Sequence, residues 1–457
     1  MPEIEVIPLG GYSDFGRNMT CVRVGREAVI FDIGIKLDRI LLHEDAVFDE
    51  MHPLDLQKLG AIPDDTPLAN LGAKVVAIVI GHGHLDHVGA VAKLAGKYRD
   101  APIIATPYTC ALIENMIHAG PPGKKGEKRR RLVPNKVTPM NAGERRSISK
   151  TLELEFVHTT HSIVQTVFPV LHTPRGAIVY ANDYKFDNSP VIGSKPNYKR
   201  LRQLSMEGVL ALICESTNAG QETKTPSEAI ARDMLKDYLF GLDNERVAVT
   251  VSTFSSHTAR IKSICEFGDE LGREVMLLGR SMDKYTTPAV ELGLLQLPAS
   301  TTIYGYGRAV EGALRKVNKD PGRYLLVATG HQGEPDALVP RIANGDLPYK
   351  IEKDHQVIFS ANVIPNPVNV ANRYILETKL RMQGARIIKG AHVSGHACAE
   401  DHRELLAMLE PEHVFPAHGG IDLQAQFVEL AETQGFRLNE SVHILRNSDR
   451  FLIPKKV

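Results

Sequence analysis

A short run of potential metal ligands is the clearest chemical signal in the sequence. Three histidines and one aspartate fall within six consecutive positions: His82, His84, Asp86 and His87. They follow a continuous apolar run at 75–80, which we expect to be a buried strand, and Gly81 and Gly83 are expected to let the backbone turn so that alternate side chains converge. Imidazole and carboxylate are the ligand types that zinc prefers in catalytic sites. The run therefore predicts a metal site in the loop after a strand, where α/β folds place their ligands.

The secondary structure expected around this loop follows two different patterns along the chain. The first third of the chain reads as short β-branched strands, at 4–9, 21–24 and 28–31, separated by glycine-rich turns. From about residue 210, apolar strand candidates alternate with helical stretches. The strands are expected at 209–214, 247–251, 275–278 and 325–328, and the helices at 226–239, 257–271 and 286–292. This alternation predicts a separate α/β unit with a parallel sheet covered on both faces.

Composition excludes several classes of protein. The 457 residues are 43% hydrophobic and 24% charged, as in globular domains, and long enough for two or three of them. The formal net charge is zero, so any binding of nucleic acid must depend on a local patch. The N-terminus does not resemble a signal peptide, no apolar run approaches the roughly 18–20 residues of a membrane span, and the five cysteines form no CxxC pair. We expect a cytoplasmic protein with reduced thiols and no membrane contact.

One segment stands out by its charge. Six basic residues face a single acidic one, Glu127, behind the turn at 121–123. They are Lys124, Lys125, Lys128, Arg129, Arg130 and Arg131. The segment is either a solvated surface loop or an arm that contacts phosphates, and the sequence favours neither reading.

The spacing His-x-His-x-Asp-His resembles the signature of the metallo-β-lactamase superfamily. That resemblance implies further ligands that match His161, Asp183 and His418, and an orienting aspartate that matches Asp32. It assigns His82, His84 and His161 to one zinc ion, Asp86, His87 and His418 to a second, and Asp183 to a bridge between them. We therefore expect two Zn²⁺ per subunit, with Mn²⁺ or Mg²⁺ as supporting alternatives. Two such ions, roughly 3.5–4 Å apart, lower the pKa of a shared water, so hydrolysis is the expected chemistry.

The long stretch between Asp183 and His418 narrows the resemblance. It exceeds 200 residues, more than a β-lactamase of this superfamily needs, and resembles the β-CASP nucleases. Glu215 matches their acidic motif A, His396 their motif B and His418 their motif C. The implied fold class is α/β, a metallo-β-lactamase αββα sandwich with an inserted β-CASP α/β domain of mainly parallel sheet. We expect the first part of the sandwich at 1–208, the insertion at 209–372 and the second part at 373–457.

Nearly end to end, the chain is similar to the ribonuclease J family. The similar segments are 8–11, 183–187, 253–256, 279–282 and 329–335. The sequence ends soon after His418, without the extra C-terminal domain of bacterial members, and so is more similar to the archaeal branch. It departs from the family's usual residues at Glu215, Asn182 and His331, which stand where aspartate, glycine and serine are common. The matched metal ligands are unaffected by these departures.

The family resemblance implies a metal-dependent ribonuclease of RNA processing and decay. We expect a 5′-to-3′ exoribonuclease that cleaves 5′-monophosphorylated single-stranded RNA by attack of a metal hydroxide on the phosphodiester. Its catalytic residues would be Asp86, Asp183, the general acid His396, and Glu215, which would hold or charge His396. Substrate-binding residues are expected at Ser255, Ser256, Gly330, His331, Gln332, Gly333, His392 and Ser394. The family also implies a homodimer, and partners in RNA decay or at the ribosome are left open.

Other functions stay open at this point. The chain could be an endoribonuclease, a small-molecule metallohydrolase or an inactive RNA-binding scaffold. The long insertion argues against a small-molecule enzyme, and the complete set of ligands argues against an inactive scaffold. His396 could instead bind phosphate or be structural, His392 could be a buried structural residue, and Ser394 could simply be a turn residue.

Overall fold

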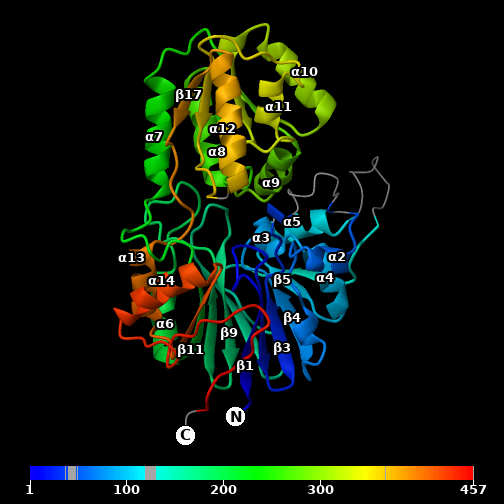
Figure 1. Ribbon diagram of the computed structural model, residues 1–457, viewed down its shortest axis with the longest axis vertical. Helices are drawn as coiled ribbons and strands as arrows, with labels where there is room; N and C mark the ends of the chain where they lie inside the picture. Colours follow the sequence, from blue (N-terminus) through cyan, green and yellow to red (C-terminus); the bar gives the residue numbers. More distant parts are fainter. Residues whose placement is uncertain (37, 40–47, 49, 119–129, 366, 456–457) are drawn as a thin grey trace.

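The fold is described here from a computed structural model of the chain (Figure 1). It describes residues 1–455 except 37, 40–47, 49, 119–129 and 366. Most of the basic segment, including Lys124, Lys125, Lys128 and Arg129, lies outside the described residues, so the two readings of that segment both stand.

One sheet begins at the N-terminus and carries the strand that precedes the histidine-rich run. Its order is β19-β1-β2-β3-β4-β5-β6, antiparallel as far as β3 and parallel from β3 to β6. The strands are β1 Ile4–Gly10, β2 Met19–Val24, β3 Glu27–Phe31, β4 Lys74–Val79, β5 Ile103–Ala105, β6 Val137–Pro139 and β19 Phe451–Leu452. Short helices cover its outer face: α2 Pro53–Lys58, α3 Leu85–Val88, α4 Val91–Leu94 and α5 Pro107–Met116.

A second sheet packs against the inner face of the first. Its order is β18-β11-β10-β9-β8-β7. The strands are β7 Arg145–Ser147, β8 Glu153–His158, β9 Val167–Thr173, β10 Gly176–Ala181, β11 Val209–Glu215 and β18 His413–Ala417. Buried residues of both sheets, such as Phe31, Phe156 and Ile213, share one core, and helices α6 Tyr198–Glu207, α13 Ala399–Leu409 and α14 Ile421–Glu432 cover the outer face. The expected αββα sandwich is confirmed.

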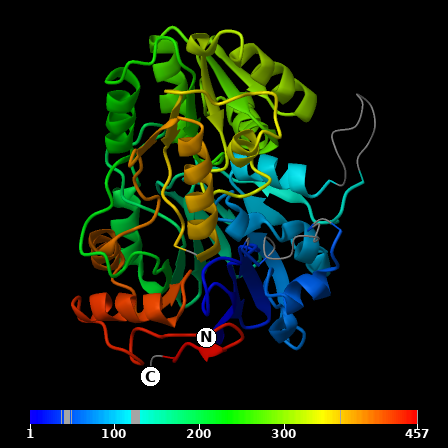
Figure 2. The same cartoon turned by 45° about the horizontal axis from the view of Figure 1, so that its top comes forward.

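A third sheet forms the upper domain in Figure 1, and all its strand pairs are parallel. Its order is β14-β13-β15-β12-β16-β17. The strands are β12 Val249–Ser252, β13 Glu274–Leu278, β14 Thr301–Tyr304, β15 Tyr324–Ala328, β16 Gln356–Phe359 and β17 Arg386–Lys389. One face packs on α10 Gly307–Val317, α11 Leu338–Asn344 and α12 Pro367–Met382, and the other on α7 Glu228–Phe240, α8 Thr258–Glu270 and α9 Arg280–Glu291. Figure 2, turned from the first view, shows this domain over one end of the sandwich.

Strand pairing moves both domain boundaries from where the sequence placed them. Strand β11, assigned to the insertion from 209 onward, pairs with β10 and β18 of the sandwich. Strand β17, assigned to the sandwich after 372, pairs with β16 of the inserted sheet. Because parallel strands buried on both faces have the same apolar composition in either sheet, composition could not show which sheet each joins. We therefore propose that the insertion begins between Glu215 and Glu228 and ends after Lys389.

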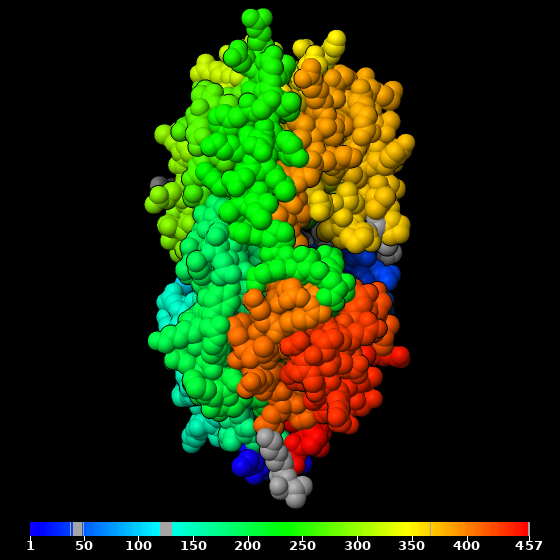
Figure 3. Space-filling model, turned by 90° about the vertical axis from the view of Figure 1, so that its left-hand side faces the viewer, coloured from blue at the N-terminus to red at the C-terminus, as the bar shows by residue number. Residues whose placement is uncertain are grey.

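The two crossings between the domains lie together. On the face in Figure 3, green and orange parts of the chain that are far apart in the sequence lie side by side. Asn218 and Cys398 form an isolated parallel bridge there, and the Thr225 hydroxyl donates to the His396 carbonyl at 2.8 Å. Elsewhere at the junction, the Tyr108 hydroxyl of α5 donates to the Tyr285 carbonyl of α9 at 2.8 Å. None of the helices in the described part of the chain has the length and apolarity needed to cross a bilayer.

Candidate metal centre

The histidine-rich run forms the loop between β4 and α3. His84 has the extended backbone of a helix N-cap, and α3 starts at the next residue. Gly83 packs closely against α5, since a Cβ there would lie 2.5 Å from Leu112 Cδ1 and the Leu112 side chain would have to shift. Neither Gly81 nor Gly83 has a positive φ, so the turn itself does not depend on glycine, contrary to the expectation from the sequence. Packing of the loop against α5 explains Gly83 better than backbone freedom does.

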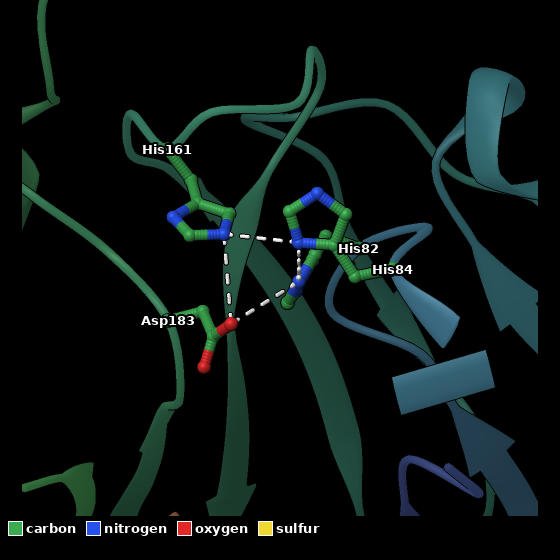
Figure 4. Close-up of side chains that lie close together, drawn as sticks. All are labelled: His82, His84, His161 and Asp183. Atoms are coloured by element: carbon green, nitrogen blue, oxygen red, sulfur yellow. Dashed lines mark hydrogen bonds and ion pairs between the residues drawn. The ribbon is translucent and has the colours of Figure 1, made fainter. Parts of the chain in front are cut away.

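Three histidines and one aspartate converge beyond the end of β4 (Figure 4). His84 Nδ1 lies 3.1 Å from His82 Nε2 and 3.0 Å from His161 Nε2. Asp183 Oδ2 lies 3.5 Å from the Nε2 atoms of both His82 and His161. Ligand atoms of all four residues lie within 4.8 Å of one another, so one ion could contact them all.

A second group of four lies directly beside the first and shares Asp183. It consists of Asp86, His87, Asp183 and His418, again with ligand atoms within 4.8 Å. His87 Nε2 lies 3.2 Å from Asp183 Oδ2, and His418 Nε2 lies 3.5 Å from Asp183 Oδ1. Asp86 Oδ2 lies 3.7 Å from His87 Nε2 and 3.6 Å from His418 Nε2. The seven residues expected from the sequence are therefore brought together as two groups joined by one carboxylate.

The chemistry of these groups fits divalent cations. Asp183 Oδ1 and His418 Nε2 are buried and have no hydrogen-bond partner among the described residues, which costs free energy unless a cation binds there. Burial lowers the pKa of His84 to about 4, and it holds the pKa of His82 and His161 well below the usual range. Neutral imidazole is the form that binds a metal ion.

Three of the strand ends that deliver side chains to the centre have an unusual backbone. Asp32, Asp183 and His418 follow β3, β10 and β18, and their φ angles are 57°, 50° and 54°. Non-glycine residues rarely adopt this left-handed conformation, which costs roughly 1–2 kcal/mol per residue. The bend at the end of each strand directs the side chains of Asp183 and His418 into the groups of candidate metal ligands, and that of Asp32 toward His87.

Hydrogen bonds to the far nitrogens fix the orientation of several candidate ligands. His87 Nδ1 lies 2.7 Å from Asp32 Oδ2, as expected for the orienting aspartate, and Gly81 N donates to Asp32 Oδ1 at 3.0 Å. His161 Nδ1 donates to the Gly395 carbonyl at 2.6 Å. His418 Nδ1 donates to Asn18 Oδ1 at 2.8 Å. Such partners determine which tautomer the ring adopts and therefore which nitrogen faces the metal.

Asn18 is a site residue that the sequence did not reveal. Its amide nitrogen also donates to the Asp86 carbonyl at 3.0 Å, so it contacts two segments of the second group. No local pattern marks it, because His418 is 400 positions away in the sequence. Only the packing of β1 and β2 beside β18 brings the two residues together.

A carboxylate and a histidine pair next to Asp183. Glu215 is fully buried, and its Oε2 lies 2.7 Å from His396 Nδ1. Its Oε1 accepts hydrogen bonds from Tyr184 N at 2.8 Å and Ala397 N at 3.3 Å. Burial lowers the pKa of His396, but the negative charges of Glu215 and Asp183 outweigh it and raise that pKa to about 9. The arrangement places an imidazole, held by a carboxylate that favours its protonated form, 4.0 Å from the shared Asp183.

Comparison with known proteins places this geometry in a family. Three family models match: the metallo-β-lactamase superfamily at 12–195, the ribonuclease J β-CASP domain at 244–377 and the RNA specificity domain of Zn-dependent metallo-hydrolases at 382–444. Ribonuclease J of Methanocaldococcus jannaschii is 48% identical over 446 residues, which cover 97% of this chain and 98% of that protein. Ribonuclease J of Pyrococcus abyssi is 49% identical over 451 residues, covering 99% and 97%. The chain belongs to the ribonuclease J family.

More distant matches agree with the fold. Ribonuclease J of a Synechocystis strain is 31% identical and aligns with 98% of this chain but 65% of its own length. A solved structure of a protein of unknown function from Enterococcus faecalis V583 superposes with a TM-score of 0.66 at 15% identity, covering 98% of this chain and all of the other. At that identity the likeness shows the fold alone.

The substrate-binding residues expected from the ribonuclease J family lie in several places. Ser394 is beside the Glu215–His396 pair, because its Oγ accepts from His396 N at 3.0 Å and from Asn218 Nδ2 at 3.3 Å. His392 is partly buried, and this burial lowers its pKa to about 3, with a smaller contribution from the charge of Arg260. Ser255 and Ser256 are partly exposed in the loop before α8, and in the described part of the chain neither forms a side-chain hydrogen bond to this group.

The glycine-rich loop at 330–333 is already used in packing. Gly333 N donates to the Gly330 carbonyl at 3.0 Å, and Gln332 N donates to Glu334 Oε2 at 3.2 Å. These two N–H groups therefore have internal partners, which weakens the expectation of a backbone anion site. His331 is buried, and its ring centroid lies 4.0 Å from that of Phe254. Binding of RNA by these residues stays a prediction.

Proposed function

We propose that this member of the ribonuclease J family is a 5′-to-3′ exoribonuclease that degrades 5′-monophosphorylated single-stranded RNA. The observation that carries its metal-dependent nuclease chemistry is the shared carboxylate of Asp183, which joins two groups of metal ligands beside the Glu215–His396 pair. Family membership supports RNA as the substrate. The proposed 5′-to-3′ direction depends on binding of the 5′-monophosphate by polar residues near His396, among them Ser394 and His392.

Zinc is the metal we propose for both groups. One group offers three imidazoles and a carboxylate, and the other two imidazoles and two carboxylates, which is the donor set of catalytic zinc sites. Bound there, the two ions would supply a water of lowered pKa and neutralise charge on the phosphate. His82, His84 and His161 would hold one, and Asp86, His87 and His418 the other.

The protein's own part in the reaction is to orient the phosphate and to move a proton. His396, held through Nδ1 by Glu215, would donate a proton to the leaving 3′-oxygen as a general acid. Because Glu215 is itself fixed by two backbone N–H groups, the imidazole is oriented before RNA binds. The buried carboxylate also stabilises the charged imidazole that this step requires.

A labelled RNA tests the proposal. The substrate carries a 5′-monophosphate with ³²P, and a matched RNA carries a 5′-triphosphate. We expect the label to be released as a mononucleotide, and the triphosphate RNA to be degraded more slowly. Internal fragments would instead indicate endonuclease action, and equal rates on both RNAs would contradict a monophosphate preference.

Assembly as a homodimer in the cytoplasm stays a prediction, and light scattering would measure the mass of the assembly.

A further inference from the structure

An exposed aromatic ring lies at the edge of this polar metal centre. Phe15 keeps 39% of its surface accessible to solvent. Its ring centroid lies 4.2 Å from that of His418, tilted by 57°, and 6.3 Å from that of His396. Phe15 therefore contacts a candidate metal ligand on one side and solvent on the other, next to the proposed general acid.

The loop that carries Phe15 is held on both sides. Arg17 N donates to the Ile35 carbonyl, and Asn18 N donates to the Asp86 carbonyl, both at 2.9 Å. Lys36 Nζ forms an ion pair with Asp14 Oδ2 at 2.7 Å. These contacts hold the segments on either side of Phe15, so its exposure beside the metal centre is a property of the fold.

We propose that Phe15 binds the substrate by stacking on a nucleobase. The base belongs to the nucleotide whose 3′-oxygen leaves, because that oxygen receives the proton from His396, whose ring is 6.3 Å away. This inference rests on the proposed function. Bases of every kind stack on aromatic rings, so the contact suits an enzyme that degrades RNA without regard to sequence. The competing interpretation is that Phe15 only shields His418 from water.

Abasic substrates separate the two interpretations. The metal-loaded enzyme would be assayed on RNA lacking the base on the 5′ side of the scissile phosphate, and on RNA lacking it on the 3′ side. We expect removal of the 5′-side base to slow the wild type on the order of ten- to a hundredfold. On intact RNA, F15A should be slower than the wild type by a similar factor. Removing the 5′-side base should slow F15A by less than about threefold more. F15L, which remains apolar but cannot stack, would behave like F15A.

Three results would overturn the inference. The first is that F15L cleaves intact RNA as fast as the wild type. The second is that removing the 5′-side base slows F15A as much as it slows the wild type. The third is that only removal of the 3′-side base slows the wild type. Phe240, at the end of α7 and 43% exposed, provides the matched control, and F240A should match the wild type throughout. If the wild type cleaves no RNA, the proposed function fails; if it cleaves RNA but F15A is unchanged, only this inference fails.

A fluorescence measurement provides a readout independent of turnover. The chain contains no tryptophan, so F15W carries the only indole of the protein. The probe is a 5′-monophosphorylated RNA with a non-hydrolysable phosphonate linkage at the first position. We expect this RNA to quench F15W emission, an abasic version to leave it unchanged, and F240W to show no response to either. Quenching by both RNAs alike would contradict base stacking.

Discussion

At the scale of single residues, Asp183 is the carboxylate that both groups of candidate metal ligands share. Its Oδ2 faces His82, His161 and His87, and its Oδ1 faces His418. Burial raises its pKa, but the neighbouring His418 and His87 outweigh that and hold the pKa well below the usual range. The carboxylate is therefore ionised and placed between two groups of neutral or cationic imidazoles, which is the arrangement that a pair of divalent ions would complete.

Replacing Asp183 by asparagine should remove the shared ligand while keeping its shape. We expect D183N to bind less metal and to lose more than about a hundredfold in RNA cleavage, since even outer partners of metal ligands are worth 10–100-fold. Elemental mass spectrometry and a cleavage assay measure the two effects. D100N, at a carboxylate with 78% of its side chain exposed, is the control. Full metal content in D183N would contradict a bridging role.

Asn18 should affect the metal without touching it. N18L removes the acceptor for His418 Nδ1 and the side-chain donor to the Asp86 carbonyl, which keeps only the backbone N–H of position 18, so we expect metal affinity to fall about 10–100-fold. N18D keeps the acceptor and should lose less. Competition with a chromophoric chelator measures the affinity. Equal affinities of N18L and the wild type would show that the contact is only structural.

Glu215 should act through His396. E215Q removes the negative charge that raises the pKa of His396, so we expect kcat to fall at least about tenfold with little change in KM. E215D keeps the charge on a shorter arm and should lie between E215Q and the wild type. Bound metal, measured on the same samples, must stay constant. A loss of metal in E215Q would assign Glu215 to the metal centre itself, which the proximity of Glu215, His396 and Asp183 also permits.

At the scale of elements, the crossings between the domains position His396. Asp401, fully buried in the first turn of α13, accepts hydrogen bonds from Thr225 N at 2.9 Å, Cys398 N at 3.3 Å and Phe186 N at 3.2 Å. It therefore joins the segment entering the insertion, the segment returning from it and the loop after Asp183. The orientation of His396 depends on the segments that Asp401 joins.

Replacing Asp401 by asparagine should loosen this junction. D401N keeps the size but weakens three hydrogen bonds to a buried charge, so we expect about 1–3 kcal/mol less free energy of unfolding. Hydrogen exchange should also become faster at Ala397 and Cys398, and urea unfolding with amide exchange measures both. E432Q, at an exposed glutamate at the end of α14, should change neither. Unchanged exchange in D401N would mean that the junction is held by other contacts.

The helices and strands also show which features of the fold and the site could be predicted from the sequence. The convergence of the candidate ligands could be predicted, because a strand, a sharp loop and a helix leave a recognisable run at 82–87, and the family resemblance implied His161, Asp183 and His418. The assignment of β11 and β17 was wrong because apolar composition does not specify which sheet a buried strand joins. Asn18 and Phe15 could not be predicted, since their roles depend on contacts with residues about 400 positions away.

At the scale of the whole molecule, a buried ion pair holds the inserted domain to the returning chain. Arg260 is fully buried and donates to Glu228 through Nε at 2.6 Å, and to the carbonyls of Ser360 and Ala391 at 2.7 and 2.8 Å. Burial raises the pKa of Glu228, but His257 and Arg260 outweigh it and hold the pKa well below the usual range. The start of α7, α8 and the segment before His392 are thereby joined.

This pair makes the stability of the protein sensitive to acid. Because the pKa of Glu228 is lower in the folded than in the unfolded chain, its contribution is fully present above the unfolded value of about 4.3 and is lost as the pH falls below it. We expect the difference in unfolding free energy between the wild type and E228Q to shrink as the pH falls from 7 to 3. Urea unfolding across that range measures the difference, and E311Q, at an exposed glutamate, is the control. A difference that does not depend on pH would contradict the prediction.

The most direct test of the central claim is RNA cleavage before and after removal of metal. The enzyme would be assayed on 5′-labelled monophosphorylated RNA as purified, after stripping with a chelator, and after return of two equivalents of Zn²⁺ per chain. We expect cleavage to disappear on stripping and to return with the second equivalent. Stripped protein that cleaves RNA as fast as before would contradict it.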